Sequence, residues 1–204
     1  MTSLASTLAA LDLAPDLSDK LSNFANLFHR WNRSINLSAA RSDAELRGQI
    51  IDSLHVIPYL RAEAAASADA SSTARVLDVG AGGGLPAVIA AICLPDTPII
   101  ALEPVHKKHA FLRTAARELA LPNLEPLAER VGDHSHRDYL AAMSRATFDL
   151  REWLVLGLTL VRPGGIVLGF EAVPRSDLPA DTQRHPYVLD DKSRAIVTLR
   201  RALA

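Results

Sequence analysis

Four residues around position 80 have the types and the spacing of a ligand-binding loop. Asp78 ends a short apolar run, and Gly80, Gly82 and Gly84 follow it at alternate positions. Glycine permits a positive φ angle and lets a ligand come close to the backbone. A helix is predicted to begin at Pro86, and the first turn of a helix offers N–H groups without a helical partner. The stretch therefore predicts a binding loop between a strand and a helix.

The spacing of the glycines separates the ligands that such a loop can hold. A dinucleotide fingerprint needs its third glycine one place later, where this chain has Leu85, and the Gly-Lys-Ser/Thr of a phosphate-binding P-loop is absent. Asp78 can bind an ammonium group. Glu103, at the end of the next predicted strand, can accept hydrogen bonds from two ribose hydroxyls. These features favour S-adenosylmethionine, and a tight turn with a surface glutamate is the alternative.

Short apolar runs alternate with helical stretches around this loop. The predicted strands cover 74–80, 97–103, 123–127, 139–143, 165–170, 187–189 and 195–199. The predicted helices cover 86–94, 105–119 and 148–160, and a turn is predicted at 162–165. Strands that alternate with crossover helices imply a parallel, doubly wound α/β sheet with its ligand site at the carboxyl ends of the strands. The last two strands are predicted to close the sheet as an antiparallel pair.

Two amphipathic helices are predicted before the sheet. Apolar residues recur at steps of three and four over 17–31, and a second stripe follows a capping box at 42–45. Trp31 belongs to the first stripe, so it is predicted to pack in the core rather than to stack on a base. The predicted domain limits are a helical cap at 1–60, a linker of small and charged residues at 61–74 and a main domain at 75–204.

Length and composition limit the class of protein. The chain has 204 residues, of which 49% are hydrophobic and 22% charged, so one main globular domain with an appendage is expected. No apolar run is long enough to span a membrane and no targeting segment is recognisable, which predicts a cytoplasmic protein. The single cysteine, Cys93, lies in an apolar stretch and predicts an inert thiol, and the scattered histidines predict no metal site.

The net charge of −1 argues against a nucleic-acid partner, because phosphate binding usually requires a basic excess. A local basic patch is still compatible with this net charge. Lys107 and Lys108 open a predicted helix that also carries Arg113, and this helix face either binds a polyanion or is merely solvated. If the partner is a nucleic acid, we expect the scattered arginines to converge near residues 80–84.

Several stretches resemble the ribosomal RNA small subunit methyltransferase G family, also called glucose-inhibited division protein B. The matching stretches are HRWNRSINLS (29–38), IDS with PYL (51–60), VLDVGAGGGLPAVIAA (76–91), KK with FLR (107–113), NLEPLAERV (123–131) and SRA (144–146). The resemblance implies a Rossmann-like class I methyltransferase, with a doubly wound, mostly parallel seven-stranded sheet and an N-terminal helical cap. It also implies methyl transfer from S-adenosylmethionine to N7 of one guanine in bacterial 16S rRNA. The implied partner is the small ribosomal subunit or its assembly intermediate, and nothing requires more than a monomer.

The resemblance further implies which residues act. N7 of guanine carries a lone pair without a proton, so the enzyme needs no general base and must mainly align the reactants. Asn36 and Arg145 are the candidate catalytic residues, because they are expected to contact the target base. The expected cofactor-binding residues are Asp78, Gly80, Gly82, Gly84, Leu85, Glu103, Arg130 and Arg145. The expected RNA-binding residues are Arg33, Asn36, Lys107, Lys108 and Arg113.

Structural roles are the alternatives for three of these residues. Asn36 could form a turn or cap between two helices. Arg145 could pair with Asp78 or Glu103, and Arg130 could form an ion pair at the surface. Each alternative predicts a specific partner that the structure can reveal.

The chain departs from the usual family pattern at three places. Gly48-Gln49 stands where the family usually has Arg-His, Gly132 stands in place of an acid, and Phe170 stands in place of a lysine. Two alternative functions follow. One is a protein that binds the cofactor and RNA with impaired catalysis, and the other is a small-molecule methyltransferase.

Overall fold

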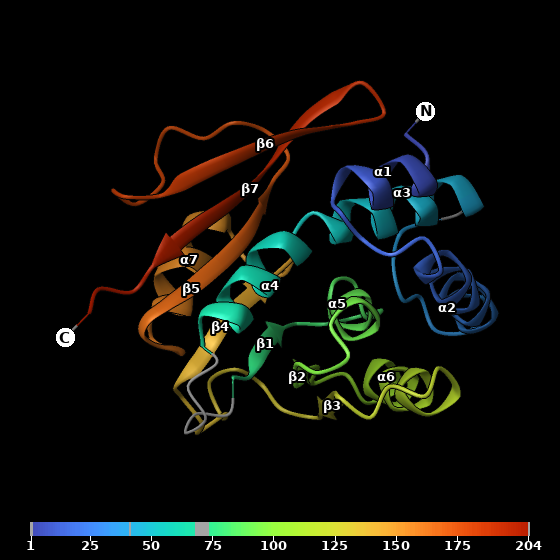
Figure 1. The fold of residues 1–204 in the computed structure, drawn as a ribbon. Coiled ribbons are helices and arrows are strands. Elements are labelled where there is room, and N and C mark those ends of the chain that lie inside the picture. Colours follow the sequence, from blue (N-terminus) through green and yellow to red (C-terminus); the bar gives the residue numbers. More distant parts are fainter. Residues whose placement is uncertain (1, 41, 68–73, 204) are drawn as a thin grey trace.

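A seven-stranded sheet runs through the molecule in the order β3-β2-β1-β4-β5-β7-β6 (Figure 1). The computed structural model describes residues 2–40, 42–67 and 74–203. The strands are β1 (Val76–Val79), β2 (Ile99–Leu102), β3 (Leu124–Leu127), β4 (Tyr139–Ser144), β5 (Val161–Glu171), β6 (Gln183–Leu189) and β7 (Lys192–Arg200). Strands β1 to β5 are parallel to one another, and β7 pairs antiparallel with β5 and β6. The predicted mostly parallel seven-stranded sheet is confirmed.

Helices cover both faces of this sheet. They are α1 (Leu4–Ala10), α2 (Leu17–Asn32), α3 (Asp43–Leu54), α4 (Ile57–Ala66), α5 (Ala87–Cys93), α6 (His106–Glu118) and α7 (Leu150–Leu158). Neighbouring residues of β1 point to opposite faces: Val76 packs in one buried cluster with Phe24 of α2, and Leu77 in another with Trp153 of α7. Figure 1 accordingly shows α7 on the opposite side of the sheet from the cap helices and α5.

The cap helix α2 packs directly on the main domain. Phe28 and Trp31 lie edge-on to the ring of Phe111 in α6, with ring centroids 5.9 Å and 5.7 Å away. Trp31 thus packs against the core as predicted, although its side chain is only half-buried. Phe28 also lies against the glycine loop, since a Cβ atom at Gly83 would be 2.5 Å from its ring. The cap can approach the loop this closely only because residue 83 has no side chain.

The N-terminal part differs from the prediction in two places. Helix α4 extends to Ala66, so residues 61–66 of the predicted linker are helical, and 68–73 lie outside the described residues. Helix α1 was not predicted. It has seven residues, no acid in its first turn and Ser3 as its N-cap, so its sequence signal is weak. The predicted cap of α3 is confirmed, because Ser42 Oγ accepts the Glu45 N–H at 3.2 Å.

The turn predicted at 162–165 is also wrong, because these residues belong to β5. The ladder between β4 and β5 changes register after Tyr139, and Gly164 has a φ angle of 77°. Pro163 and the following glycines thus bend an irregular strand without ending it. The long β5 then pairs with β7 over its whole second half.

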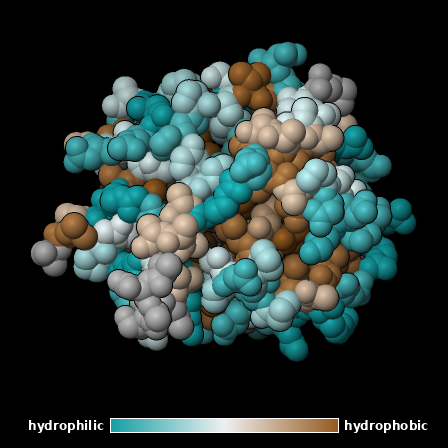
Figure 2. All heavy atoms as spheres, in the orientation of Figure 1, coloured by the Kyte–Doolittle hydropathy of each residue, from teal (hydrophilic) through white to brown (hydrophobic). Residues whose placement is uncertain are grey.

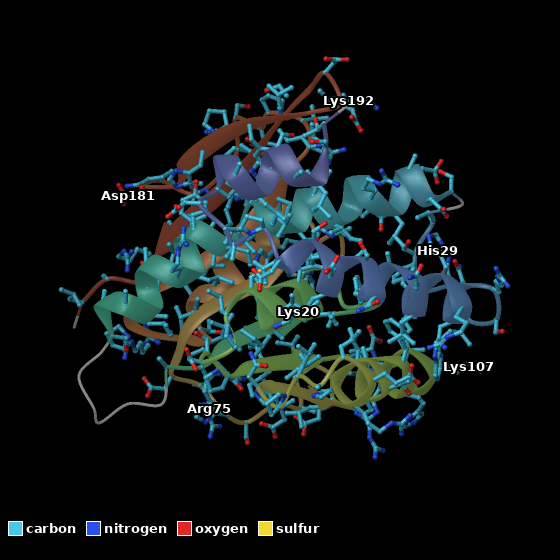
Figure 3. All side chains as sticks on the ribbon, turned by 45° about the vertical axis from the view of Figure 1, so that its right-hand side comes forward. Lys20, His29, Arg75, Lys107, Asp181 and Lys192 are labelled. Carbon is cyan, nitrogen blue, oxygen red and sulfur yellow. The ribbon has the colours of Figure 1, made fainter. Side chains whose placement is uncertain are left out.

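The β6–β7 hairpin leans over the cap. Its turn consists of Asp190 and Asp191, whose φ angles of 47° and 62° match a two-residue hairpin turn. The Thr2 N–H donates to Oδ1 of Asp190 at 2.9 Å, and the Asp190 N–H donates to Oγ1 of Thr2. This tie holds the tip of the hairpin beside the beginning of the described chain, and Lys192 marks that tip in Figure 3.

Hydrophobic side chains gather near the middle of the face drawn in Figure 2, in the region of α4 and α5, and hydrophilic side chains surround them. Within 2–40, 42–67 and 74–203, no helix combines the length and the apolar character needed to cross a bilayer.

Cys93 ends α5 in a half-buried position, and burial raises its pKa to about 12. The thiol is therefore protonated at neutral pH, in line with the inert role expected for it.

Candidate cofactor and substrate site

The glycine loop leads from the carboxyl end of β1 into α5. Gly80, Gly82 and Gly84 all have positive φ angles, of 74°, 55° and 79°. A Cβ atom at Gly80 would lie 2.4 Å from the Thr147 hydroxyl, so the loop after β4 closes over this position. A Cβ atom at Gly82 would meet only the Gly80 carbonyl oxygen, 3.7 Å away. The backbone at Gly82 is thus open to a ligand.

Two buried carboxylates stand at the ends of β1 and β2. Glu103 holds the loop in place, because Oε2 accepts the Gly82 N–H and Oε1 accepts the Val105 N–H, both at 2.8 Å. Oδ2 of Asp78 accepts the Ala87 N–H at 3.0 Å. Oδ1 of Asp78 is buried and has no hydrogen-bond partner among the residues that the structure describes. A buried carboxylate oxygen without a donor is expected to receive one from a ligand.

The environment of Asp78 disfavours its charged form. Burial raises the pKa of this carboxyl to about 7, against the smaller opposing effects of the Ala87 N–H and the Arg145 guanidinium. Glu103 raises it slightly further. A cationic ligand group at Oδ1 would oppose this shift by stabilising the carboxylate, so the site suits a positive charge.

These residues fit S-adenosylmethionine. Oδ1 of Asp78 can accept the ammonium of its amino-acid part. The Glu103 oxygens each hold one backbone N–H and retain lone pairs for ribose hydroxyls. The open backbone at Gly82 allows a ligand to pass between these two carboxylates. Leu85 contributes its carbonyl to Arg145 instead, since Nε of Arg145 donates to it at 3.2 Å.

Arg145 connects the glycine loop with the cap. Besides its bond to the Leu85 carbonyl, its Nη1 atom lies 3.5 Å from Oδ2 of Asp52 in α3. The ion pair predicted as an alternative thus exists, but with Asp52 rather than with Asp78 or Glu103. Burial lowers the pKa of Arg145, and the Asp52 carboxylate opposes this effect. The guanidinium is held at the carboxyl end of β4, as expected.

Asp52 is a functional candidate that the sequence did not single out. It is 4% exposed, and its Oδ1 accepts the Tyr187 hydroxyl at 2.7 Å and lies 3.4 Å from Nη1 of Arg194. The Tyr187 ring stacks on His55 with centroids 3.8 Å apart. One carboxylate therefore joins α3, the β4 loop and the β6–β7 hairpin. The only sequence signal was the Ile-Asp-Ser stretch that contributes to the resemblance.

Three of the expected RNA-binding residues lie together. Arg33, Asn36 and Lys108 line one polar groove of about 1070 Å³ between the end of α2 and α6, with His29 and Arg30 beside them. Figure 3 shows His29 on the same side of the molecule as Lys107 at the beginning of α6. The groove brings together cations from the cap and from the main domain.

Lys107 and Arg113 are exposed on α6 and do not line this groove. Asn36 lines it, whereas Arg145 lines two other hollows, so the structure does not bring the two candidate catalytic residues into one cavity. The alternative prediction for Asn36 was a turn or cap between two helices. In the structure, Asn32 makes the side-chain hydrogen bonds that stabilise this turn. Oδ1 of Asn32 accepts the Leu37 N–H at 2.7 Å, and its Nδ2 donates to the Ala40 carbonyl.

Arg130 lies in the loop after β3 rather than at the strand end, because β3 ends at Leu127. Its side chain is exposed and forms no ion pair within the described part of the chain, so the surface ion pair is not observed. The expected convergence of the arginines is only partly met. Arg175, Arg184 and Arg200 pair instead with acids away from the loop, among them Glu171 for Arg184.

Comparison with known proteins identifies the family. The sequence profile of rRNA small subunit methyltransferase G matches residues 17–201. The chain belongs to this family. A relative named Ribosomal RNA small subunit methyltransferase G from Burkholderia multivorans (strain ATCC 17616 / 249) is 37% identical over 179 residues, which are 83% of this chain and 74% of the relative. One of the same name from Burkholderia mallei (strain NCTC 10229) is 38% identical over 159 residues, 75% of this chain and 66% of the relative.

Solved structures place the family's fold among class I methyltransferases. Magnesium protoporphyrin IX methyltransferase from Synechocystis PCC 6803, with bound S-adenosylmethionine, superimposes with a TM-score of 0.60 at 14% identity, over 86% of this chain and 91% of that one. A methyltransferase from Geobacter sulfurreducens gives 0.58 at 13% identity, over 88% of each chain. This likeness confirms the predicted Rossmann-like fold, and family membership makes the protein an S-adenosylmethionine-dependent methyltransferase.

Proposed function

We propose that the protein transfers the methyl group of S-adenosylmethionine to N7 of a guanine in the rRNA of the small ribosomal subunit. The observation that carries this proposal is the buried Oδ1 of Asp78, which lacks a partner among the described residues and belongs to the strand that leads into the glycine loop with its open backbone at Gly82. Arg145 reaches the same loop through the Leu85 carbonyl. A cofactor site and a guanidinium able to hold a base thus share one edge of the sheet.

Asp78 and Glu103 bind different parts of the cofactor. Asp78 binds the ammonium, Glu103 binds the ribose hydroxyls, and the glycine loop leaves room for the ligand between them. When bound, S-adenosylmethionine supplies a methyl group attached to a positively charged sulfur. The protein's own contribution is to orient the ligand from three sides, which is the main requirement for an in-line transfer.

Arg145 aligns the acceptor base. Its guanidinium is planar and offers several donors in a fixed geometry, of which two are already fixed by Leu85 and Asp52. The remaining donors can hold O6 of guanine. Asp52 partly offsets the charge of the guanidinium, which lowers the repulsion that N7 meets as it becomes positively charged. N7 carries no proton, so none of these residues has to remove one.

The RNA strand is proposed to lie in the polar groove between α2 and α6. Arg33 and Lys108 would bind its phosphates, and Asn36 would contact a neighbouring nucleotide. Leu37, next to Asn36, lies against the glycine loop, where a Cβ atom at Gly83 would be 3.2 Å from its own Cβ atom. The cap at 1–60 thus forms a path for RNA toward the cofactor. The domain limits stay part of this proposal, with a main domain at 75–204 and a connecting segment at 61–74 whose first residues, up to Ala66, are helical.

We further propose that the enzyme acts as a monomer and needs no metal ion. Attack of the N7 lone pair on a sulfonium methyl group requires no Lewis acid to activate the nucleophile. Activity that survives a chelator, in a protein that sediments with the mass of one chain, is the expected result. Loss of activity with the chelator would contradict the metal-free mechanism.

The test of the proposed function uses purified protein and S-adenosylmethionine with a labelled methyl group. Small ribosomal subunits, naked 16S rRNA, large-subunit rRNA and guanosine are offered separately. We expect label in a single 7-methylguanosine of 16S rRNA, whether this RNA is offered in small subunits or naked. We expect no label in large-subunit rRNA or in guanosine. Label in guanosine would favour a small-molecule methyltransferase, and tight cofactor binding without any transfer would favour a catalytically impaired RNA-binding protein.

A further inference from the structure

A second cavity lies directly behind Arg145. It has a volume of about 300 Å³ and is bounded by the end of β4, by α7 and by the end of β5. Three aromatic side chains line it, namely Phe148, Trp153 and Phe170. Phe148 and Trp153 stack on each other with ring centroids 5.8 Å apart and an interplanar angle of 18°. The cavity therefore offers flat apolar walls.

Charged side chains also line this cavity. Asp52, Arg145 and Arg194 all line it, and they are the same three residues that form the ion-pair cluster between cap and hairpin. Arg194 carries a buried Nε atom that has no hydrogen-bond partner among the described residues. The cavity thus combines aromatic walls, one carboxylate and two guanidinium groups.

The cavity borders the cofactor loop. Ser144, which also lines it, donates its hydroxyl to the Val79 carbonyl at 2.7 Å, and Arg145 donates to the Leu85 carbonyl. Val79 and Leu85 flank the glycine loop on its two sides. A planar group inside the cavity would therefore lie next to the ligand of Asp78.

We propose that this cavity receives the target guanine, swung out of its RNA strand, with Asp52 as the residue that selects guanine. Enzymes that modify a base commonly take it out of the stack, hold it between aromatic or apolar side chains and read its Watson–Crick edge. The carboxylate of Asp52 accepts from the N1–H and the N2 amino group of guanine, and Arg145 and Arg194 donate to O6. Adenine offers neither pair of contacts, since its corresponding edge has no N1–H and no carbonyl oxygen. This inference rests on the proposed function and names the base pocket of the same site.

Phe170 provides one wall of this pocket. It is half-buried near the end of β5 and lines the same cavity as Asp52 and the two arginines. A phenyl ring can stack on a base regardless of the base's charge, and it attracts a base that becomes cationic during the reaction.

Trp153 provides a direct probe, because it lines the cavity and the chain has only one other tryptophan, Trp31. In a Trp31→Phe variant, the emission of Trp153 is recorded while guanosine monophosphate is added in the presence of S-adenosylhomocysteine, which keeps the cofactor site filled. We expect saturable quenching by guanosine monophosphate and at least tenfold weaker binding of adenosine and inosine monophosphates, because each lost donor removes one hydrogen bond between the base and the buried Asp52 carboxylate. Equal affinities for all three nucleotides, or no quenching, would overturn the assignment.

Two variants separate recognition from folding. Asp52→Asn is expected to reduce the preference for guanosine over inosine monophosphate to within about threefold, a ratio that a purely structural role would leave unchanged. Phe170→Ala is expected to weaken guanosine monophosphate binding on the order of tenfold, and Phe170→Trp to restore it. Val173→Ala, at an exposed position that does not line the cavity, is the control for both.

The outcomes also separate this inference from the proposed function. If the protein methylates small-subunit rRNA but its Trp153 emission does not respond to guanosine monophosphate, the base lies elsewhere and only the pocket is wrong. If guanosine monophosphate binds selectively but no rRNA is methylated, the pocket stands and the proposed activity is wrong.

Discussion

Nη1 of Arg145 lies 3.5 Å from Oδ2 of Asp52, although the two residues are 93 positions apart in the sequence. The pair joins cap helix α3 to the loop after β4. Asp52 is almost fully buried and also accepts the Tyr187 hydroxyl, so the carboxylate cannot turn away from the guanidinium without losing a second partner. The orientation of Arg145 toward the cofactor loop is therefore set by the contact between the cap and the sheet.

Replacing Arg145 by lysine tests this arrangement. Lysine keeps the charge but cannot bind the Leu85 carbonyl and a base together in one plane. We expect kcat/KM for rRNA methylation to fall by about 10- to 100-fold, which corresponds to about 1–3 kcal/mol for a lost bidentate contact. The affinity for S-adenosylhomocysteine, measured by calorimetry, should change less than about threefold. Arg75→Lys, at the other end of β1, is the control and should leave both values unchanged.

The pKa of Asp78 makes a prediction about stability. Because burial raises this pKa to about 7, the folded state holds the proton more tightly than the unfolded state does. The stabilising contribution of this group is fully present below the unfolded pKa of 3.8 and is lost as the pH rises through about 7. At pH 8, Asp78→Asn should therefore have a higher free energy of unfolding than the native protein, by up to about 4 kcal/mol, when both are unfolded with denaturant. This difference should shrink toward pH 4.

The same variant should lose the cofactor. An amide cannot balance the ammonium charge, so S-adenosylhomocysteine should bind to Asp78→Asn about 10- to 100-fold more weakly, which corresponds to the loss of a hydrogen bond between charged groups. For the native protein, affinity should fall as the pH drops below 7, since the carboxyl must lose its proton to bind. A variant that is more stable and still binds the cofactor normally would show that Asp78 has no part in the site.

Gly83 tests the contact between cap and loop. A methyl group there would lie 2.5 Å from the Phe28 ring and 3.2 Å from the Leu37 Cβ atom, so the cap must shift. We expect Gly83→Ala to cost about 1–3 kcal/mol of unfolding free energy and to reduce methylation. Gly48→Ala is the matched control. Its methyl group would meet nothing within 4 Å in helix α3, and it should stabilise the protein by about 0.5–1 kcal/mol.

The polar groove predicts a salt dependence. Lys108 lines the groove with Arg33, and removing one phosphate contact should reduce the slope of log Kd against log salt by about 1. Lys108→Ala should therefore weaken binding to small-subunit rRNA and flatten this slope. Lys20→Ala removes the same charge from an exposed position of α2 that does not line the groove. Equal slopes for the two variants would place the RNA elsewhere.

Local patterns were sufficient to predict the cofactor loop. Gly80, Gly82 and Gly84 were recognisable because a positive φ angle restricts the residue type wherever it occurs. Glu103 was recognisable because it ends the strand beside Asp78, and parallel strands bring their carboxyl ends to one edge. The buried stripe of α2 followed from its spacing in the same way.

The charged cluster could not be predicted in the same manner. Asp52, Arg145 and Tyr187 come from three distant parts of the chain, and only the folded sheet and the closing hairpin bring them together. The predicted pairing of Arg145 with Asp78 or Glu103 was wrong because sequence order gave no sign that α3 approaches the β4 loop. The turn predicted at 162–165 failed for another reason, since the proline and glycines there serve an irregular strand.

The most direct test of the whole account is the methylation state of small-subunit rRNA in a strain that lacks the gene for this protein. Mass mapping of methylated guanines should show one 7-methylguanosine missing, restored by the native protein and not by Asp78→Asn. An unchanged set of methylated guanines in the deletion strain would contradict the central claim that this chain methylates guanine N7 in small-subunit rRNA.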